Sequence, residues 1–81
     1  MDNSIMGVIR TLTPDEAAER LKKLGVSTSA QKIRAGLEQG VYPFGVRIQM
    51  KGNVYEIYER LFNKWVEERI DKGDESGENN N

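Results

Sequence analysis

Glycine and proline divide the middle of this chain into short pieces, and these breaks limit what the chain can form. Gly25 and Gly40 each follow a stretch with helical spacing, and Pro43 and Gly45 flank Phe44 a few residues later. Glycine commonly ends a helix in a left-handed turn, and proline removes a backbone donor and biases the residue before it toward extended geometry. We therefore expect short helices followed by strands, joined by tight connections.

The first helix has the clearest start. Thr13 can cap free N–H groups, Pro14 suits the first helical position, and Glu16 stands three residues after the cap, as in a capping box. Apolar residues then recur at helical spacing up to the glycine that ends the helix, namely Ala17, Ala18, Leu21 and Leu24. The pattern predicts a helix from Pro14 to the residues just before Gly25.

A second helix is predicted after Val26, with Ser27 or Thr28 as its cap and a connection of three or four residues. A rotation of 100° per residue puts Ala30, Ile33 and Leu37 on its core face. The opposite face contains no acidic residue and has Arg34 on one flank; it consists of Thr28, Gln31, Lys32, Ala35 and Gln39. This helix is either an ordinary amphipathic surface helix or one that reads bases in the major groove, and its neighbours favour the second interpretation.

The segment after Gly45 alternates as a strand does. Val46, Ile48 and Met50 share one face and Arg47 and Gln49 share the other. The tripeptide Lys51-Gly52-Asn53 then predicts a turn before a second strand, VYEI. Lys51 and Arg47 can contact phosphates at such a hairpin, although Lys and Asn are also common at exposed turns.

Large apolar side chains at helical spacing, Tyr58, Leu61, Phe62 and Trp65, predict a third helix over residues 59–70. Such a stripe is expected to close the core rather than to stack on bases. The fold class is therefore α+β, a small winged helix-turn-helix with two N-terminal helices, a β-hairpin wing and a C-terminal helix. We expect one domain over residues 9–72, after a flexible N-terminus at residues 1–8. Val8 and Ile9, where the two meet, are expected to pack as a short strand.

Charge is unevenly distributed. The net charge is −1, yet residues 20–64 contain nine basic and three acidic residues. The segment 73–81, GDESGENNN, adds three acids and no base, and it has too little apolar surface to repay its ordering entropy. We predict a disordered acidic tail after a basic middle, and the basic middle favours a nucleic-acid partner.

The chain has no cysteine and no histidine. These absences exclude disulfides, thiolate chemistry and the commonest general base, and there is no glycine-rich loop to hold a phosphate. We therefore expect no catalytic residue, no metal site, no cofactor and no small-molecule substrate. No apolar run approaches the roughly 20 residues of a membrane span, so a cytoplasmic protein without a membrane partner is expected.

The ordered set LTPDEAAERLKKLGVSTSAQKIRAGLEQG, the PFG that follows, and the later segments RIQM and YEIYERLFNKW resemble a known family. They are similar to the excisionase-type winged-helix DNA-binding domains of phages and conjugative transposons, which also resemble the DNA-binding part of MerR-type regulators. The resemblance covers about two thirds of the chain, from Leu12 to Glu67. It implies that Thr28, Ser29, Gln31, Lys32 and Arg34 lie at recognition-helix positions, and that Arg47, Lys51 and Asn53 lie in the wing.

The expected function is sequence-specific binding of double-stranded DNA, in phage or mobile-element recombination or in transcription regulation. Other copies of the chain on DNA, or a recombinase (integrase), are the expected protein partners. The alternative is a protein-interaction module on the same fold, such as a phage antirepressor or a packaging or assembly factor. An exposed apolar patch at Val41, Tyr42 and Phe44 would favour that alternative.

Overall fold

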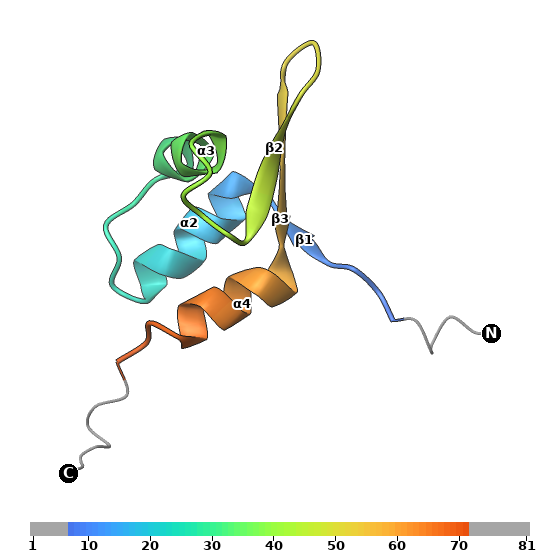
Figure 1. Ribbon diagram of the computed structural model, residues 1–81. Coiled ribbons are helices and arrows are strands. Elements are labelled where there is room, and N and C mark those ends of the chain that lie inside the picture. The colour runs from blue at the N-terminus through green and yellow to red at the C-terminus, as the bar shows by residue number, and fades with distance from the viewer. Residues whose placement is uncertain (1–6, 72–81) are drawn as a thin grey trace.

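The computed structural model describes residues 7–71, which form three helices and a three-stranded antiparallel sheet (Figure 1). In chain order the elements are β1 (Thr11–Leu12), α2 (Pro14–Lys23), α3 (Ala30–Glu38), β2 (Gly45–Gln49), β3 (Asn53–Tyr58) and α4 (Glu59–Glu67). The strand order is β1-β3-β2. The α+β fold class is confirmed, and the arrangement is that of a small winged helix. The predictions for residues 1–6 and for the tail at 73–81 lie outside the described residues.

Helix α2 begins as its sequence predicts. The Thr13 side-chain oxygen accepts from the Glu16 amide at 3.0 Å, and the Glu16 carboxylate accepts from the Thr13 amide at 2.9 Å. Both halves of the capping box are therefore present, with Pro14 at the start of the helix.

Two glycines end the first two helices in the same way. Gly25 and Gly40 have φ angles of 93° and 72°, in the left-handed region that favours glycine. The Gly25 amide donates to the Lys22 carbonyl and the Val26 amide to the Leu21 carbonyl, and the same two bonds recur around Gly40. This is the Schellman arrangement, and both predicted helix ends are confirmed.

The start of α3 differs from the prediction. Its N-cap is Ser29, whose hydroxyl accepts from the Lys32 amide at 3.2 Å, so neither Ser27 nor Thr28 caps the helix. The Schellman bonds at Gly25 use the Val26 amide to close α2, and the chain then runs on without helical structure to Ser29. The connection from Leu24 to Ser29 is therefore longer than the three or four residues expected.

The sheet also corrects one prediction. Val8 and Ile9 form no strand and are 76% and 82% exposed. The first strand is instead Thr11–Leu12, because Leu12 pairs with Ile57 and both side chains are buried. On the other edge of β3, the β2 pairing begins at Gly45 and Ile57 and ends at Gln49 and Asn53, which confirms the predicted hairpin.

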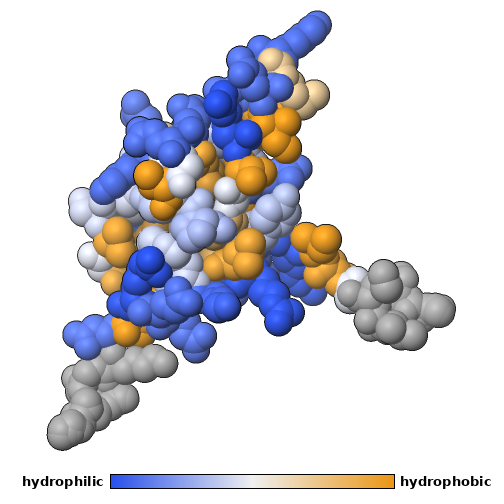
Figure 2. Space-filling view, viewed as in Figure 1, coloured by the Kyte–Doolittle hydropathy of each residue, from blue (hydrophilic) through white to orange (hydrophobic). Residues whose placement is uncertain are grey.

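The two faces of this hairpin have different neighbours. Arg47, Gln49, Asn53 and Tyr55 share the face that turns toward α3, as the strand register requires. The opposite face carries Val46, Ile48, Met50 and Val54, all of them exposed. In the space-filling view, hydrophobic side chains accordingly reach the surface on the side of the hairpin away from α3 (Figure 2).

The core lies between the helices and the base of the sheet. It contains Leu12, Ala17, Ala18, Leu21, Ile33, Leu37, Phe44, Ile57 and Phe62. Phe44 is fully buried and stacks on Tyr42 at 4.9 Å between ring centroids, so the apolar patch considered at Val41, Tyr42 and Phe44 does not form on the surface. Leu24 and Leu61 are 50% and 45% exposed, although their helical spacing matched that of core residues.

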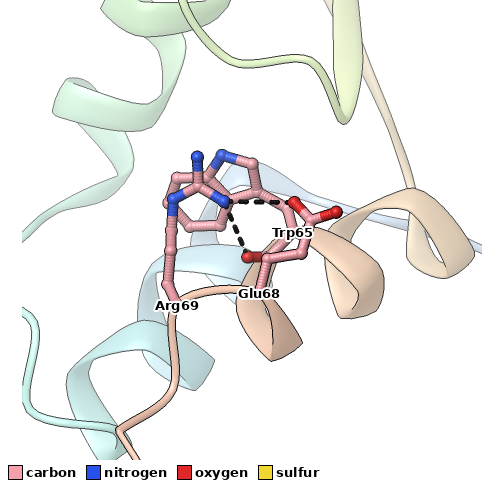
Figure 3. A network of polar contacts seen from close by, with 3 residues as sticks. All are labelled: Trp65, Glu68 and Arg69. Atoms are coloured by element: carbon pink, nitrogen blue, oxygen red, sulfur yellow. Dashed lines mark hydrogen bonds and ion pairs between the residues drawn. The ribbon is translucent and has the colours of Figure 1, made fainter.

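Trp65 belongs to an aromatic cluster with Tyr42, Phe44 and Phe62. Its ring meets Tyr42 edge-on at 5.7 Å and Phe44 at 5.1 Å. The Arg69 guanidinium lies over the indole at 4.2 Å and donates to the Trp65 carbonyl at 2.9 Å (Figure 3). The predicted structural role of Trp65 fits these contacts, since both neighbouring rings and a guanidinium cover it.

Helix α4 ends at Glu67, three residues before the predicted limit. An ion pair between Arg20 and Glu59, 3.0 Å long, joins the start of α4 to α2. None of the helices in the described part of the chain is long and apolar enough to cross a membrane.

Candidate nucleic-acid interface

Helix α3 is held at one side of the molecule by its apolar face. Ile33, Gly36 and Leu37 are buried, whereas Gln31 and Lys32 are exposed and Arg34 is half-buried. Helical geometry puts Gln31 outward, Arg34 and Glu38 on one flank and Lys32 on the other. A row of polar side chains therefore runs along the outer side of the helix.

The hairpin lies beside the flank that carries Arg34 and Glu38. The Tyr55 hydroxyl donates a hydrogen bond to Glu38 Oε2, and Asn53 Nδ2 approaches the same oxygen at 3.5 Å. Arg47 in turn donates to Asn53 Oδ1 and to Gln49 Oε1, each at 3.5 Å. These contacts join side chains of α3, β2 and β3 into one polar surface.

We call this region the α3–hairpin surface. It comprises Gln31, Lys32, Arg34, Glu38, Arg47, Gln49, Lys51, Asn53 and Tyr55. Of the six predicted residues in α3 and the hairpin, Gln31, Arg34, Arg47, Lys51 and Asn53 lie on the hairpin or on the outward side and near flank of α3. Lys32 marks the edge of the surface, on the flank of α3 away from the hairpin. Lys51 stands at the tip, in the loop between β2 and β3.

Two other predicted site residues have different surroundings. The Thr28 hydroxyl oxygen is buried without a hydrogen-bond partner among residues 7–71, so this conformation does not present it to a ligand. Ser29 is exposed, and its oxygen caps α3. Its hydroxyl proton can still be donated, close to the positive end of the helix dipole.

The electrostatics of the surface depend on which charges are already paired. Arg20 pairs with Glu59, and Lys22 lies 3.9 Å from Glu19, both away from the α3–hairpin surface. Within the described range, no ion pair involves Lys32, Arg34, Arg47 or Lys51. These four cations are therefore available to an anionic ligand such as a phosphate backbone.

Glu38 and Tyr55 were not predicted as site residues. The hydrogen bond to Glu38 raises the pKa of Tyr55 above its ordinary value of 10.0, with burial as the second cause, while Asn53 and the nearby Arg34 act in the opposite direction. The sequence contained a partial signal for these two residues, since Glu38 follows Arg34 by one helical turn and Tyr55 lies on the same face of β3 as Asn53. Which flank of α3 faces the hairpin is a tertiary feature that this spacing does not give.

The side chains of the α3–hairpin surface offer several kinds of hydrogen-bond donor. Among the described residues, no group of three or more acidic side chains could hold a metal ion. The surface combines amide, guanidinium and ammonium donors on a helix and on a projecting hairpin, the chemistry that recognises base edges and phosphates.

Comparison with known proteins identified no relative. No protein-family model matches the chain, and no match was found among curated proteins or solved structures.

Proposed function

We propose that this chain is a non-enzymatic, sequence-specific DNA-binding protein of excisionase type that acts in the cytoplasm. Its role would be architectural, in the recombination of a phage or mobile element, or that of a small transcription regulator. One observation carries the proposal: an exposed polar helix face and a projecting hairpin form one surface whose basic side chains are unpaired within residues 7–71.

In this function α3 enters the major groove, which is wide enough for a helix, and the hairpin follows the backbone or an adjacent minor groove. Gln31 is placed to read bases from the outward side of α3, with Arg34 and Lys32 on its flanks. Lys51 contributes a point charge to the phosphates from the hairpin tip. Phosphate contacts supply most of the affinity, and the few base contacts set the site.

One such domain covers a short site. Single modules bury roughly 600–1,000 Å² of protein surface on DNA, so binding by one copy is expected to be modest. Neighbouring copies or a recombinase would then strengthen binding and could stabilise a bend in the DNA.

The test is a salt titration of DNA binding on two duplexes, a site selected from a random pool and a random sequence. Lys51→Ala should weaken binding to both about equally and reduce the slope of log K against log salt by roughly 0.9, the value for one phosphate contact. Gln31→Ala and Lys32→Ala should instead reduce the preference for the selected site, by about 1–3 kcal/mol for a good base contact.

Lys64→Ala is the matched control, since it removes the same charge from α4, on the far side of α2 from α3 (Figure 1). Its slope should equal that of the wild type. An unchanged slope for Lys51→Ala would place the hairpin off the DNA, and unchanged base preference in both helix variants would exclude α3 as the reading helix.

The alternative function, a protein-interaction module, is favoured by a different observation. Val46, Ile48, Val54 and Met50 are each 40% or more exposed on the hairpin face away from α3. Contiguous apolar side chains of this kind often mark a protein contact. A wild-type protein that binds neither duplex at low salt would favour this second candidate.

A further inference from the structure

Glu38 is an unexpected residue at its position. It is the last residue of α3, where the helix dipole disfavours a negative charge, and the last turn contains no basic residue to offset it. It is also one of only three acids in residues 20–64, on a surface that otherwise offers cations. Apart from Arg34 one helical turn earlier, neither the helix dipole nor attraction to phosphate favours a carboxylate there.

The contacts of Glu38 suggest what it does. Within the described chain, the side-chain hydrogen bonds between α3 and the hairpin both end on its Oε2 atom, one from the Tyr55 hydroxyl and one from Asn53 Nδ2. The Asn53 oxygen then accepts from Arg47, a predicted DNA contact. Glu38 therefore lies between the helix proposed to read bases and the hairpin proposed to contact phosphates.

Apolar packing does little to fix the outer half of the hairpin against α3. The base of the hairpin is anchored by Ile57, which is fully buried. Beyond Tyr55, the side chains that turn toward α3 are polar, and the valine, isoleucine and methionine side chains turn the other way and are exposed. Beyond the Tyr55 ring, which packs against the core, polar contacts are thus the side-chain restraint that the outer half of the hairpin has toward α3.

We infer that Glu38 is a positioning residue, which holds the hairpin at a fixed place relative to α3 through Tyr55 and Asn53 so that both elements meet one duplex together. The role in DNA recognition rests on the proposed DNA-binding function. The restraint of the hairpin by Glu38, which we call the hold, is a property of the free protein. The raised pKa of Tyr55 fits the hold, because the phenol keeps the proton that Glu38 accepts.

The hold and the charge of Glu38 have opposite consequences for DNA. The hydrogen bonds order the hairpin before binding, which reduces the entropy lost in the complex. The negative charge repels phosphates. Glu38→Gln keeps an acceptor oxygen and removes the charge, whereas Glu38→Ala removes both, and Tyr55→Phe removes the donor but keeps the ring and the carboxylate.

The first measurement needs no DNA. Backbone ¹⁵N relaxation should show increased motion of the hairpin amides of residues 47–54 in Glu38→Ala and Tyr55→Phe, and near wild-type motion in Glu38→Gln. Tyr58→Phe is the matched control: it removes a tyrosine hydrogen bond of 2.7 Å to Glu56 on the other face of the same strand. Its hairpin motion should not change. Wild-type relaxation in both Glu38→Ala and Tyr55→Phe would overturn the inference.

The second measurement links the hold to recognition. Glu38→Ala and Tyr55→Phe should each reduce the ratio of selected-site to random binding by about five- to tenfold, as for the loss of one or two hydrogen bonds. Lys51→Ala should lower the salt slope in the wild type and much less in the Glu38→Ala background, because a mobile hairpin no longer places its tip. Glu38→Gln should bind random duplex more tightly than the wild type.

The outcomes separate this inference from the proposed function. A wild type that binds no duplex would overturn the DNA-binding proposal, and the relaxation data would still decide whether Glu38 holds the hairpin. Loss of discrimination at a single base pair in Glu38→Ala, with hairpin motion unchanged, would mean that Glu38 reads a base directly and would overturn the positioning role.

Discussion

At the scale of single residues, small side chains near helix ends decide where the elements begin. Ser27, Thr28 and Ser29 all carry hydroxyls before α3, and the sequence pattern indicated Ser27 or Thr28, wrongly, as the cap. Only Ser29 has both the extended backbone of an N-cap, with φ −154° and ψ 165°, and the hydrogen bond to the Lys32 amide. A hydroxyl shortly before the helix is therefore not sufficient to cap it.

We predict that Ser29→Ala lowers the free energy of unfolding by about 0.5–2 kcal/mol, the usual effect of removing an N-cap. Ser27→Ala, an exposed loop change two residues away, should stay within about 0.5 kcal/mol of the wild type. Chemical denaturation of both variants makes the comparison. Equal losses would contradict the cap assigned to Ser29.

The raised pKa values of two tyrosines determine how the free energy of unfolding should change at high pH. Hydrogen bonds to Glu38 and Glu56, respectively, raise the pKa of Tyr55 and of Tyr58 above 10.0, with burial contributing to both. A folded-state pKa above the unfolded value means that the stabilisation is complete below pH 10 and is lost as the pH rises through the folded pKa. The unfolded chain releases these protons first.

Thermal unfolding between about pH 9 and 11 should therefore show a steeper loss of stability in the wild type than in the Tyr55→Phe, Tyr58→Phe double variant. The two proteins differ only at these two side chains, so the difference between their curves isolates the two phenols. Parallel curves would show that the hydrogen bonds to the two carboxylates do not raise the pKa values of the two tyrosines.

At the scale of elements, α4 shows how far helical spacing predicts burial. Leu61 and Phe62 both belong to the predicted apolar stripe. Phe62 is 1% exposed and meets Phe44 edge-on at 5.1 Å, whereas Leu61 is 45% exposed. The sheet base and the aromatic cluster cover only part of the apolar side of α4.

Phe62→Ala should therefore cost on the order of 3–5 kcal/mol, the usual penalty for truncating a buried aromatic residue. That is a large fraction of the stability of a domain this small. Leu61→Ala should cost no more than about 1 kcal/mol, since much of its side chain is already in water. Denaturation curves that gave the two variants similar losses would contradict the packing of α4 described above.

At the scale of the whole molecule, charge is divided between a basic middle and an acidic end. The segment 73–81 carries Asp74, Glu75 and Glu78 and no basic residue, so its deletion changes the formal net charge from −1 to +2. Long-range repulsion between these acids and phosphates depends on ionic strength, with a Debye length of about 30 Å at 0.01 M and 10 Å at 0.1 M salt.

Deletion of residues 73–81 should strengthen binding to random duplex at low salt, and the gain should shrink as salt is added. The matched control keeps the chain length and replaces the three acids by Asn, Gln and Gln. It should show the same gain if charge is the cause. A gain on deletion but not on neutralisation would indicate that the bulk of the segment, rather than its charge, opposes binding.

The sequence alone determined the features that depend on neighbours along the chain. The capping box at Thr13, the glycine ends at Gly25 and Gly40 and the alternation of the hairpin follow from local geometry, and each is found in the structure. Tertiary packing decided the rest: that Phe44 is buried, that Leu61 is not, and that Ser29 caps α3. It also brought Glu38 to Tyr55 across 17 positions of sequence, because the angle between α3 and the hairpin depends on the shared core beneath them. Local patterns specify which faces are apolar, but only the assembled core determines which polar side chains then meet.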